Sequence, residues 1–278
     1  MKREIQLGGS IYLELEIVEH SENYAKFILS DVTPTFANTI RRMILSEVPT
    51  MAIDEVIIIE NTTPLYDEIV AHRLGLIPLK TDLESFVRPE LCSCGGQGCT
   101  SCEVSLTLEK SGEQDVEIVF SKDLLSQDPK IVPVYPNIPV LKMAKDQKIF
   151  LEAIARLGRG LEHAKWQPTS TVSYKYHPCV EFNLNNCTFC GDCVEVCPRD
   201  IIKIENDEIK AVNIINCSLC NQCVDICELD AINVTTTGKD FIFIVESTGA
   251  LTVKKTLIKA LELLKEKAEA FNTLVDEF

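Results

Sequence analysis

The chain has 13 cysteines, and eight of them fall into two copies of one spacing pattern. In each copy, two residues separate the first three cysteines from one another, and three residues precede the fourth. The two copies are Cys187, Cys190, Cys193 and Cys197, then Cys217, Cys220, Cys223 and Cys227. Thiolates this close along a chain bind metal centres, because a short loop can turn several sulfur atoms toward one point.

This spacing is typical of bacterial ferredoxins, in which three close cysteines bind one [4Fe–4S] cluster and the fourth binds the other cluster. We therefore predict two clusters whose ligands cross between the copies. The first cluster is assigned Cys187, Cys190, Cys193 and Cys227. The second cluster is assigned Cys217, Cys220, Cys223 and Cys197. The residues after the fourth cysteines run in parallel, with Asp200 and Ile202 matching Asp230 and Ile232, although Glu228 stands where the motif has a proline. Because both the spacing and the flanks repeat, zinc or disulfides explain this segment poorly.

Four more cysteines form a separate group, and three glycines lie between them: Cys92, Cys94, Cys99 and Cys102. Glycines allow the backbone to turn tightly enough for four sulfur atoms to converge tetrahedrally. The pattern predicts a structural Zn²⁺ site, and a pair of disulfides is the alternative that the residues leave open. Cys179 is assigned no role, because a lone cysteine is usually a small buried apolar residue.

The composition is that of a folded, acidic protein. Of 278 residues, 46% are hydrophobic, and 42 Asp and Glu against 27 Lys and Arg give a net charge of −15. These values argue against disorder, and an acidic chain is a poor free-standing binder of nucleic acid. No apolar run approaches a membrane span, and none follows the N-terminus as in a secretory signal. We expect a cytoplasmic protein with reduced thiols.

Hydrophobic periodicity and turn residues predict the elements that carry these sites. A helix is expected to begin at Thr33 and Pro34 and to end at Pro49, since Thr caps helices and Pro fits the first turn. The segment 149–158 has a mixed pattern. The remaining expectations are strands at 11–17, 25–29, 52–60 and 171–176, a hairpin of 104–108 with 116–120, and a short helix at 66–75.

Two helices have an apolar face at helical spacing. The first is formed by Phe36, Ile40, Ile44 and Val48. The second lies in the C-terminal helix and follows a heptad-like pattern: Leu257, Leu261, Leu264, Ala268, Phe271 and Val275. We expect both faces to bind a partner chain and to bury about 1,000 Å² or more. Packing of these faces on the protein's own sheet is the alternative.

Several segments resemble the α-like subunits of multisubunit RNA polymerases, and with the iron–sulfur segment the resemblance is to the archaeal D-type subunits. These segments are 38–49, 52–54, 71–79, 163–169 and 245–251. The resemblance implies an α+β fold with a discontinuous α-like dimerisation domain, an inserted mixed or β domain, and a ferredoxin-like domain with two [4Fe–4S] clusters. The implied bounds are 1–50 with 234–278, then 51–176 including the zinc loop 92–102, then 177–233.

The resemblance also implies a non-catalytic scaffold. Its apolar helices would bind the small α-like subunit L, and the heterodimer would assemble the large catalytic subunits alongside small subunits N and P. The sequence has no compact array of aspartates to hold Mg²⁺, so we expect no catalytic residue and no direct sequence-specific DNA contact. The clusters are expected to be structural or to regulate assembly by redox. An electron-transfer, polyferredoxin-like subunit of a redox complex is the alternative.

Overall fold

The structure is a computed structural model that describes residues 2–7, 11–206 and 208–277. Clustering of its tertiary contacts divides the chain into two compact units. The first unit consists of Met1–Glu19, Ala25–Asn38 and Ser173–Ile244. The second unit consists of His20–Tyr24, Thr39–Val172 and Val245–Phe278.

Strands dominate the described residues. They are β1 (Lys2–Leu7), β2 (Ile11–His20), β3 (Tyr24–Ser30), β4 (Pro49–Asn61), β5 (Glu103–Ser111), β6 (Glu117–Phe120), β7 (Leu125–Ser126), β8 (Pro139–Met143), β9 (Lys148–Arg159), β10 (Thr169–Phe182), β11 (Ile202–Glu205), β12 (Glu208–Ala211) and β13 (Ile232–Ser247). The α-helices are α1 (Pro34–Ser46), α2 (Asp67–Gly75), α3 (Asp192–Glu195), α4 (Gln222–Asp225) and α5 (Val253–Asp276). Single 3₁₀ turns lie at Pro89–Leu91, Ser121–Asp123, Ala164–Trp166 and Ile214–Asn216. The result is a mixed α+β protein.

The first unit is built on a five-stranded sheet with the order β1-β2-β3-β13-β10. This order brings β3, from the start of the chain, beside β13, from its last fifth. Phe27 of β3 stacks on Phe243 of β13 with ring centroids 5.1 Å apart, and Tyr174 of β10 meets Phe241 edge-on at 5.4 Å. Aromatic pairs of this kind stabilise neighbouring strands beyond the area that they bury.

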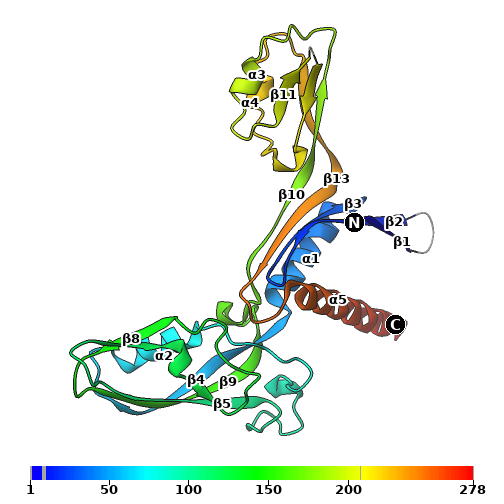
Figure 1. Ribbon diagram of the computed structural model, residues 1–278. Helices are drawn as coiled ribbons and strands as arrows, with labels where there is room; N and C mark the ends of the chain where they lie inside the picture. The colour runs from blue at the N-terminus through cyan, green and yellow to red at the C-terminus, as the bar shows by residue number, and fades with distance from the viewer. Residues whose placement is uncertain (1, 8–10, 207, 278) are drawn as a thin grey trace. The chain divides into compact units, whose positions relative to one another are not determined.

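The cysteine-rich segment is an insertion between two neighbouring strands of this sheet. Figure 1 shows β10 and β13 running side by side to the point where the segment begins and ends. The Asn183 amide donates to the Ala231 carbonyl oxygen at 2.9 Å and closes the base of the insertion. Inside it, β11 and β12 pair as an antiparallel hairpin, and α3 and α4 are single turns that each follow a cysteine loop.

The second unit contains a sheet with the order β4-β9-β5-β7 and a separate pair formed by β6 and β8. Helix α2 contributes Val70 and Leu74, both fully buried, to the same core as the inward side chains of the sheet. The predicted hairpin of 104–108 with 116–120 is wrong, because β5 pairs with β9 and β7 while β6 pairs with β8. The segment 149–158, which had a mixed pattern, lies in the long strand β9.

Threonine side chains cap the two long helices, and the cap of α1 is the one predicted from the sequence. Thr33 Oγ1 accepts a hydrogen bond from the Phe36 amide at 3.2 Å, and α1 ends before Pro49. Thr252 Oγ1 accepts from the Lys255 amide at 3.3 Å and begins α5, which has 24 residues. Within the described ranges, no helix combines the length and the apolar character that crossing a membrane requires.

Candidate metal centres

The four cysteines of the zinc loop converge in the structure. Their sulfur atoms all lie within 4.8 Å of one another. The distance is 3.5 Å between Cys92 and Cys99, 3.6 Å between Cys94 and Cys102, and 3.7 Å between Cys99 and Cys102. Zn–S bonds of about 2.3 Å in a tetrahedron place sulfur atoms about 3.8 Å apart. None of the four forms a disulfide in the structure, and the separations of their sulfur atoms suit a single four-coordinate zinc ion.

Backbone geometry and burial support this convergence. Gly98 has φ +91°, and a Cβ added there would collide with the Glu103 carboxylate. Burial raises the pKa of the Cys102 thiol to about 12, whereas a hydrogen bond with the Cys92 thiol lowers the pKa of Cys94 to about 6. The Cys94 and Cys102 thiols therefore hold their protons unequally, and a bound cation is what would bring both of them to the thiolate state.

The two four-cysteine copies of the insertion have matching local structure. Phe189 and Leu219, at equivalent positions, have φ angles of 58° and 57°. Cys197 and Cys227, the fourth cysteines of the copies, each accept a hydrogen bond at sulfur from the backbone N–H four residues later, at 3.4 Å and 3.3 Å. A left-handed backbone is unfavourable for bulky residues such as Phe and Leu. Its presence at the same position of both copies indicates that the placement of the cysteines, and not local propensity, determines the shape of the loops.

The eight cysteines of the insertion line two separate cavities. A cavity of about 320 Å³ is lined by Cys187, Cys190, Cys193 and Cys227. A second, narrower cavity of about 20 Å³ is lined by Cys197, Cys217, Cys220 and Cys223. In each case three sulfur donors come from one copy and one from the other, which is the donor set of a [4Fe–4S] cluster. The residues therefore fit two such clusters.

The fully buried core beside these cavities is small, although apolar side chains such as Ile209, Ile226 and Ile232 line the first and Ile201, Ile202 and Val234 line the second. The members of this buried core are Cys193, Ile201, Ile202, Ile209 and Ile232. Burial raises the pKa of the Cys193 thiol and of the Cys223 thiol. One of the five core members, Cys193, is a predicted ligand, and five more cysteines pack against this core: Cys187, Cys197, Cys217, Cys223 and Cys227. The cysteines therefore occupy much of the space that apolar side chains fill in an ordinary domain.

Two lysines bond to Asn216 and Cys217, at the start of the second ligand loop, and no local pattern in the sequence predicts either contact. Lys175 of β10 donates from Nζ to the Cys217 carbonyl oxygen at 2.8 Å. Lys26 of β3 donates to Asn216 Oδ1 at 3.5 Å. Burial lowers the pKa of Lys175, the charge on Cys217 raises it, and the neighbouring charges of Lys26 and Arg199 lower it. The second ligand loop is thereby attached to the sheet.

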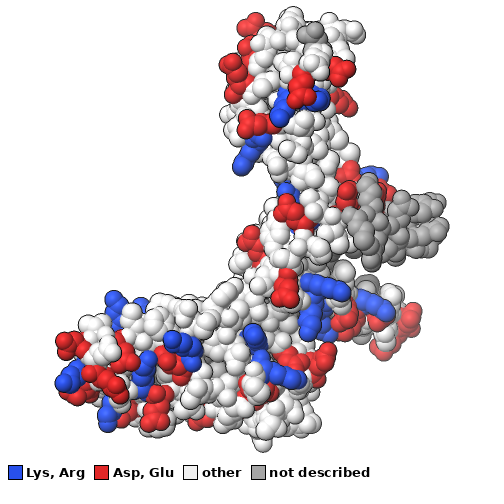
Figure 2. Space-filling view, viewed as in Figure 1, with Lys and Arg blue, Asp and Glu red and all other residues white. Residues whose placement is uncertain are grey.

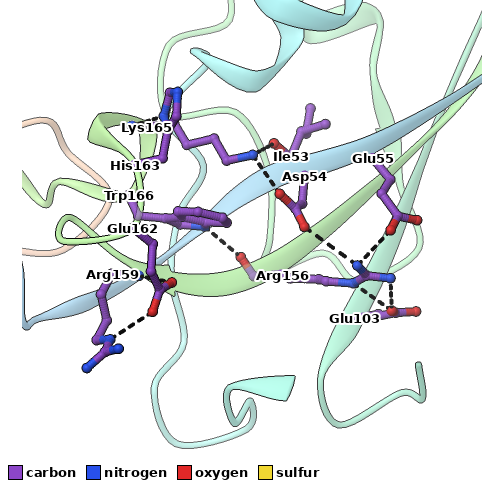
Figure 3. A network of polar contacts seen from close by, with 10 residues as sticks. All are labelled: Ile53, Asp54, Glu55, Glu103, Arg156, Arg159, Glu162, His163, Lys165 and Trp166. Carbon is purple, nitrogen blue, oxygen red and sulfur yellow. Dashed lines mark hydrogen bonds and ion pairs between the residues drawn. The ribbon is translucent and has the colours of Figure 1, made fainter. Parts of the chain in front are cut away.

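Two of the polymerase-like segments, 52–54 and 163–169, meet in the second unit (Figure 3). Lys165 Nζ donates to Asp54 Oδ1 at 2.7 Å and to the Ile53 carbonyl oxygen at 3.1 Å. The same ammonium lies 4.3 Å from the centre of the Trp166 ring, a cation–π distance. Trp166 in turn donates from Nε1 to the Arg156 carbonyl oxygen at 3.1 Å. These contacts join β4, β9 and the turn before β10.

Arg156 extends the network across the sheet. Its guanidinium donates to Glu103 Oε1 at 2.7 Å and to Glu55 Oε1 at 2.9 Å, and it lies 3.5 Å from Asp54 Oδ2. Three strands, β4, β5 and β9, therefore share one cation (Figure 3). The carboxylates of this network all face the arginine and are not grouped to bind a metal ion. The network therefore stabilises the sheet.

The two apolar helix faces differ in the structure. Ile40 and Ile44 of α1, and Val48 just after it, are buried in the chain itself, so the prediction that they form an open partner surface is corrected. The physical reason is that helical periodicity identifies an apolar face but not what covers it. Phe36 remains 37% exposed.

On α5, by contrast, no residue after Ala260 is buried. The exposed large apolar side chains of α5 are Ile258, Leu261, Phe271, Leu274 and Val275. Among the other predicted positions, Leu257 and Leu264 are half-buried and Ala268 is exposed.

Comparison with known proteins gives a family match for the region that contains the loop 92–102 and another for the eight-cysteine segment. Residues 53–174 match the RNA polymerase Rpb3/RpoA insert domain, and residues 186–232 match the 4Fe-4S dicluster domain. The DNA-directed RNA polymerase subunit Rpo3 of Archaeoglobus fulgidus is 46% identical over 264 residues, which cover 95% of this chain and 98% of that protein. The Rpo3 of Methanosphaera stadtmanae is 43% identical over 269 residues, covering 95% and 99%, and that of Methanosarcina acetivorans is 42% identical over 268 residues, covering 95% and 99%.

Proposed function

This chain belongs to the family of the archaeal DNA-directed RNA polymerase subunit Rpo3, and from that membership we propose that it is a non-catalytic assembly subunit of an archaeal DNA-dependent RNA polymerase. The observation that carries the proposal is similarity over nearly the whole length, with 46% identity across 95% of the chain. The excess of acidic residues supports contact with proteins and not with DNA. Catalytic residues are expected in other subunits, and the cytoplasm is the expected compartment.

The proposed first partner is the small α-like subunit L, bound through α5 as a heterodimer. Leu261, Phe271 and Leu274 are 49%, 65% and 60% exposed. A monomeric protein rarely leaves so many large apolar side chains on one long helix without a partner. Lys267 also lies 2.8 Å from Glu47, just beyond α1, so α5 is held to the chain while its apolar residues stay open. The pairing of β3 with β13 supports a dimerisation domain formed from both ends of the chain.

The heterodimer would then be the platform on which the large catalytic subunits assemble, with small subunits N and P alongside. The Lys165–Asp54–Arg156 network supports this role, because it stiffens the surface formed by two family-like segments. A platform needs a rigid surface, since flexible contact residues must be ordered at a free-energy cost when the partner binds.

The proposed cofactors are two [4Fe–4S] clusters and one structural Zn²⁺. The small apolar core of the insertion supports a structural role for the clusters, as bound metal can supply the folding free energy that a small core lacks. Loss of a cluster to oxidation would then loosen the insertion and reduce assembly, which is the proposed regulatory role. The Zn²⁺ would hold the loop 92–102 in the same way.

The test is anaerobic purification of the full chain from cells that express subunits L, N, P and the large subunits. We expect these subunits to co-purify and expect eight iron, eight sulfide and one zinc per chain, from two clusters and one four-cysteine site. Co-purification with a dehydrogenase or hydrogenase instead would favour the electron-transfer alternative. A chain that binds none of the polymerase subunits would contradict the scaffold proposal.

A further inference from the structure

The two cluster cavities differ in the charges that line them. Among the described residues that line the first cavity are two carboxylates, Asp192 and Glu228, and neither Lys nor Arg. Among those that line the second are Arg199 and neither Asp nor Glu. Asp and Glu outnumber Lys and Arg in the sequence of the insertion, and acidic side chains are prominent on the face of it that Figure 2 shows, so the cationic surroundings of the second cavity are a local exception.

Lys175 makes this difference larger. Its ammonium group donates to the carbonyl oxygen of Cys217, a ligand residue of the second cavity, at 2.8 Å. Lys175 is half-buried, and its charge is therefore less screened by water than a surface charge. Lys26 adds a second cation at Asn216, directly before Cys217. No carboxylate among the described residues is recorded within salt-bridge distance of Lys175 or Lys26, so neither cation is neutralised by an ion pair there.

Charge around an iron–sulfur cluster sets how readily it accepts an electron. Reduction adds one negative charge to the cluster and breaks no bond in the protein. A nearby cation stabilises the reduced state and raises the reduction potential, whereas a nearby carboxylate lowers it. Hydrogen bonds to the ligand sulfur atoms act in the same direction as cations.

We propose that the two clusters are electrostatically unequal, with the cluster at Cys197, Cys217, Cys220 and Cys223 having the higher reduction potential. This cluster accepts the first electron, and Lys175 is the residue that raises its reduction potential above that of the other cluster. The cluster at Cys187, Cys190, Cys193 and Cys227 is the more easily oxidised of the two. This inference rests on the proposed presence of two clusters, and it gives them different roles. The second cluster attaches the insertion to β10, and the first cluster reacts with oxidants.

The test is a redox titration of the anaerobically prepared full chain with dithionite and mediators, followed by EPR. The wild type is expected to show two one-electron steps. Lys175→Met should shift the upper step to lower potential and leave the lower step in place. Lys175→Arg keeps the charge, so its upper step should stay at the wild-type potential. Asp192→Asn, at an exposed position, should raise only the lower step. Lys210→Met is the matched control, because Lys210 is paired with Glu205 at 2.6 Å, and both steps should be unchanged.

The outcomes separate this inference from the proposed function. Two clusters that titrate together, or a Lys175→Met variant that leaves both steps in place or moves the lower one, would overturn the inequality while the iron count stays at eight. A chain that takes up no iron and sulfide would overturn both the inequality and the proposed cofactors. If Lys175→Met does not hold its clusters, the Asp192→Asn shift decides the matter, because a rise of the upper step or of neither step contradicts the assignment.

Discussion

Lys165 and Asp54 are joined by a hydrogen bond of 2.7 Å although 111 positions separate them in the sequence. The Lys165 side chain is 14% exposed and that of Asp54 is 31% exposed, so the pair is partly shielded from water. The same ammonium contacts the Ile53 carbonyl oxygen and the Trp166 ring. One side chain therefore determines how the turn before β10 sits on β4.

Replacing Lys165 with Met is expected to lower the free energy of unfolding by about 1–3 kcal/mol, because the Ile53 carbonyl and the Asp54 carboxylate lose a charged donor. Trp166 is the single tryptophan of the chain, so its fluorescence during urea unfolding reports on this site. A double-mutant cycle with Asp54→Asn should give a coupling free energy of at least about 0.5 kcal/mol.

Lys130 and Asp82 provide the control for this measurement. Their ion pair is as short, at 2.6 Å, but the Lys130 side chain is 62% exposed. Exposed pairs contribute about 0–1 kcal/mol, so Lys130→Met should have a smaller effect. Equal losses from the two lysine variants would show that shielding of Lys165 is not what matters.

Gly249 and Gly238 allow backbone strain to be separated from packing. Both have positive φ, 91° and 72°, but a Cβ on Gly249 would collide with Val134, whereas nothing lies within 4 Å of one on Gly238. Gly238→Ala should cost about 1–2 kcal/mol from backbone strain alone. Gly249→Ala should cost a further amount of about 1–3 kcal/mol from overpacking. Thermal unfolding followed by circular dichroism compares them, and equal losses would contradict the packing argument.

The parts of the structure that the sequence predicted are those fixed by local chain geometry. Cysteines a few residues apart must share a site, and Thr33 caps a helix whatever lies around it. By contrast, alternation identifies strands 104–108 and 116–120 but does not say which strand lies beside each. The partner of β5 is β9, which comes after both of them.

Three other features depended on tertiary structure. In β9, Leu151, Ala153 and Ala155 point into the core, but apolar Phe150 and Ile154 alternate with them, so the pattern had no clear polar face. The contact between Lys175 and Cys217 joins a strand to a loop 42 positions away, and neither residue type signals it locally. The sequence predicted the apolar face of α1, but it did not predict that this face is buried within the chain itself.

The open part of α5 should matter for partner binding and not for the stability of the chain. Leu261→Glu and Phe271→Glu, at positions 49% and 65% exposed, should change the free energy of unfolding by no more than about 0.5 kcal/mol. Each should weaken the heterodimer with subunit L by more than about tenfold, as expected for central apolar contacts. Isothermal titration calorimetry with purified L measures the affinity.

Ile44 gives the opposite control, since it is fully buried. Ile44→Ala should lower the free energy of unfolding by about 2–5 kcal/mol. A Leu261→Glu, Phe271→Glu double variant that binds L with wild-type affinity would rule out this face as the interface.

Glu162 should contribute to acid sensitivity. Burial raises its pKa, but the Arg159 backbone N–H and guanidinium lower it more, so the pKa lies below its usual value near 4.5. A carboxyl with a depressed pKa contributes stability that is present above its unfolded pKa and is lost as the pH falls through the folded pKa. Glu162→Gln should therefore flatten the decline of stability below about pH 4.5. Parallel pH curves for wild type and variant would contradict this assignment.

The zinc loop should lose its ion without disturbing the iron–sulfur clusters, because Cys94 belongs to a quartet that shares no residue with the cluster cavities. Cys94→Ser is expected to weaken zinc binding by at least about tenfold, since one of four thiolate donors is gone. Elemental analysis should show the zinc falling from one per chain toward none while iron stays at eight. Cys179→Ser, which removes a half-buried thiol of β10 outside every quartet, should keep both metals. Iron loss in Cys94→Ser would mean that the sites are linked, and full retention of zinc would exclude the loop as its site.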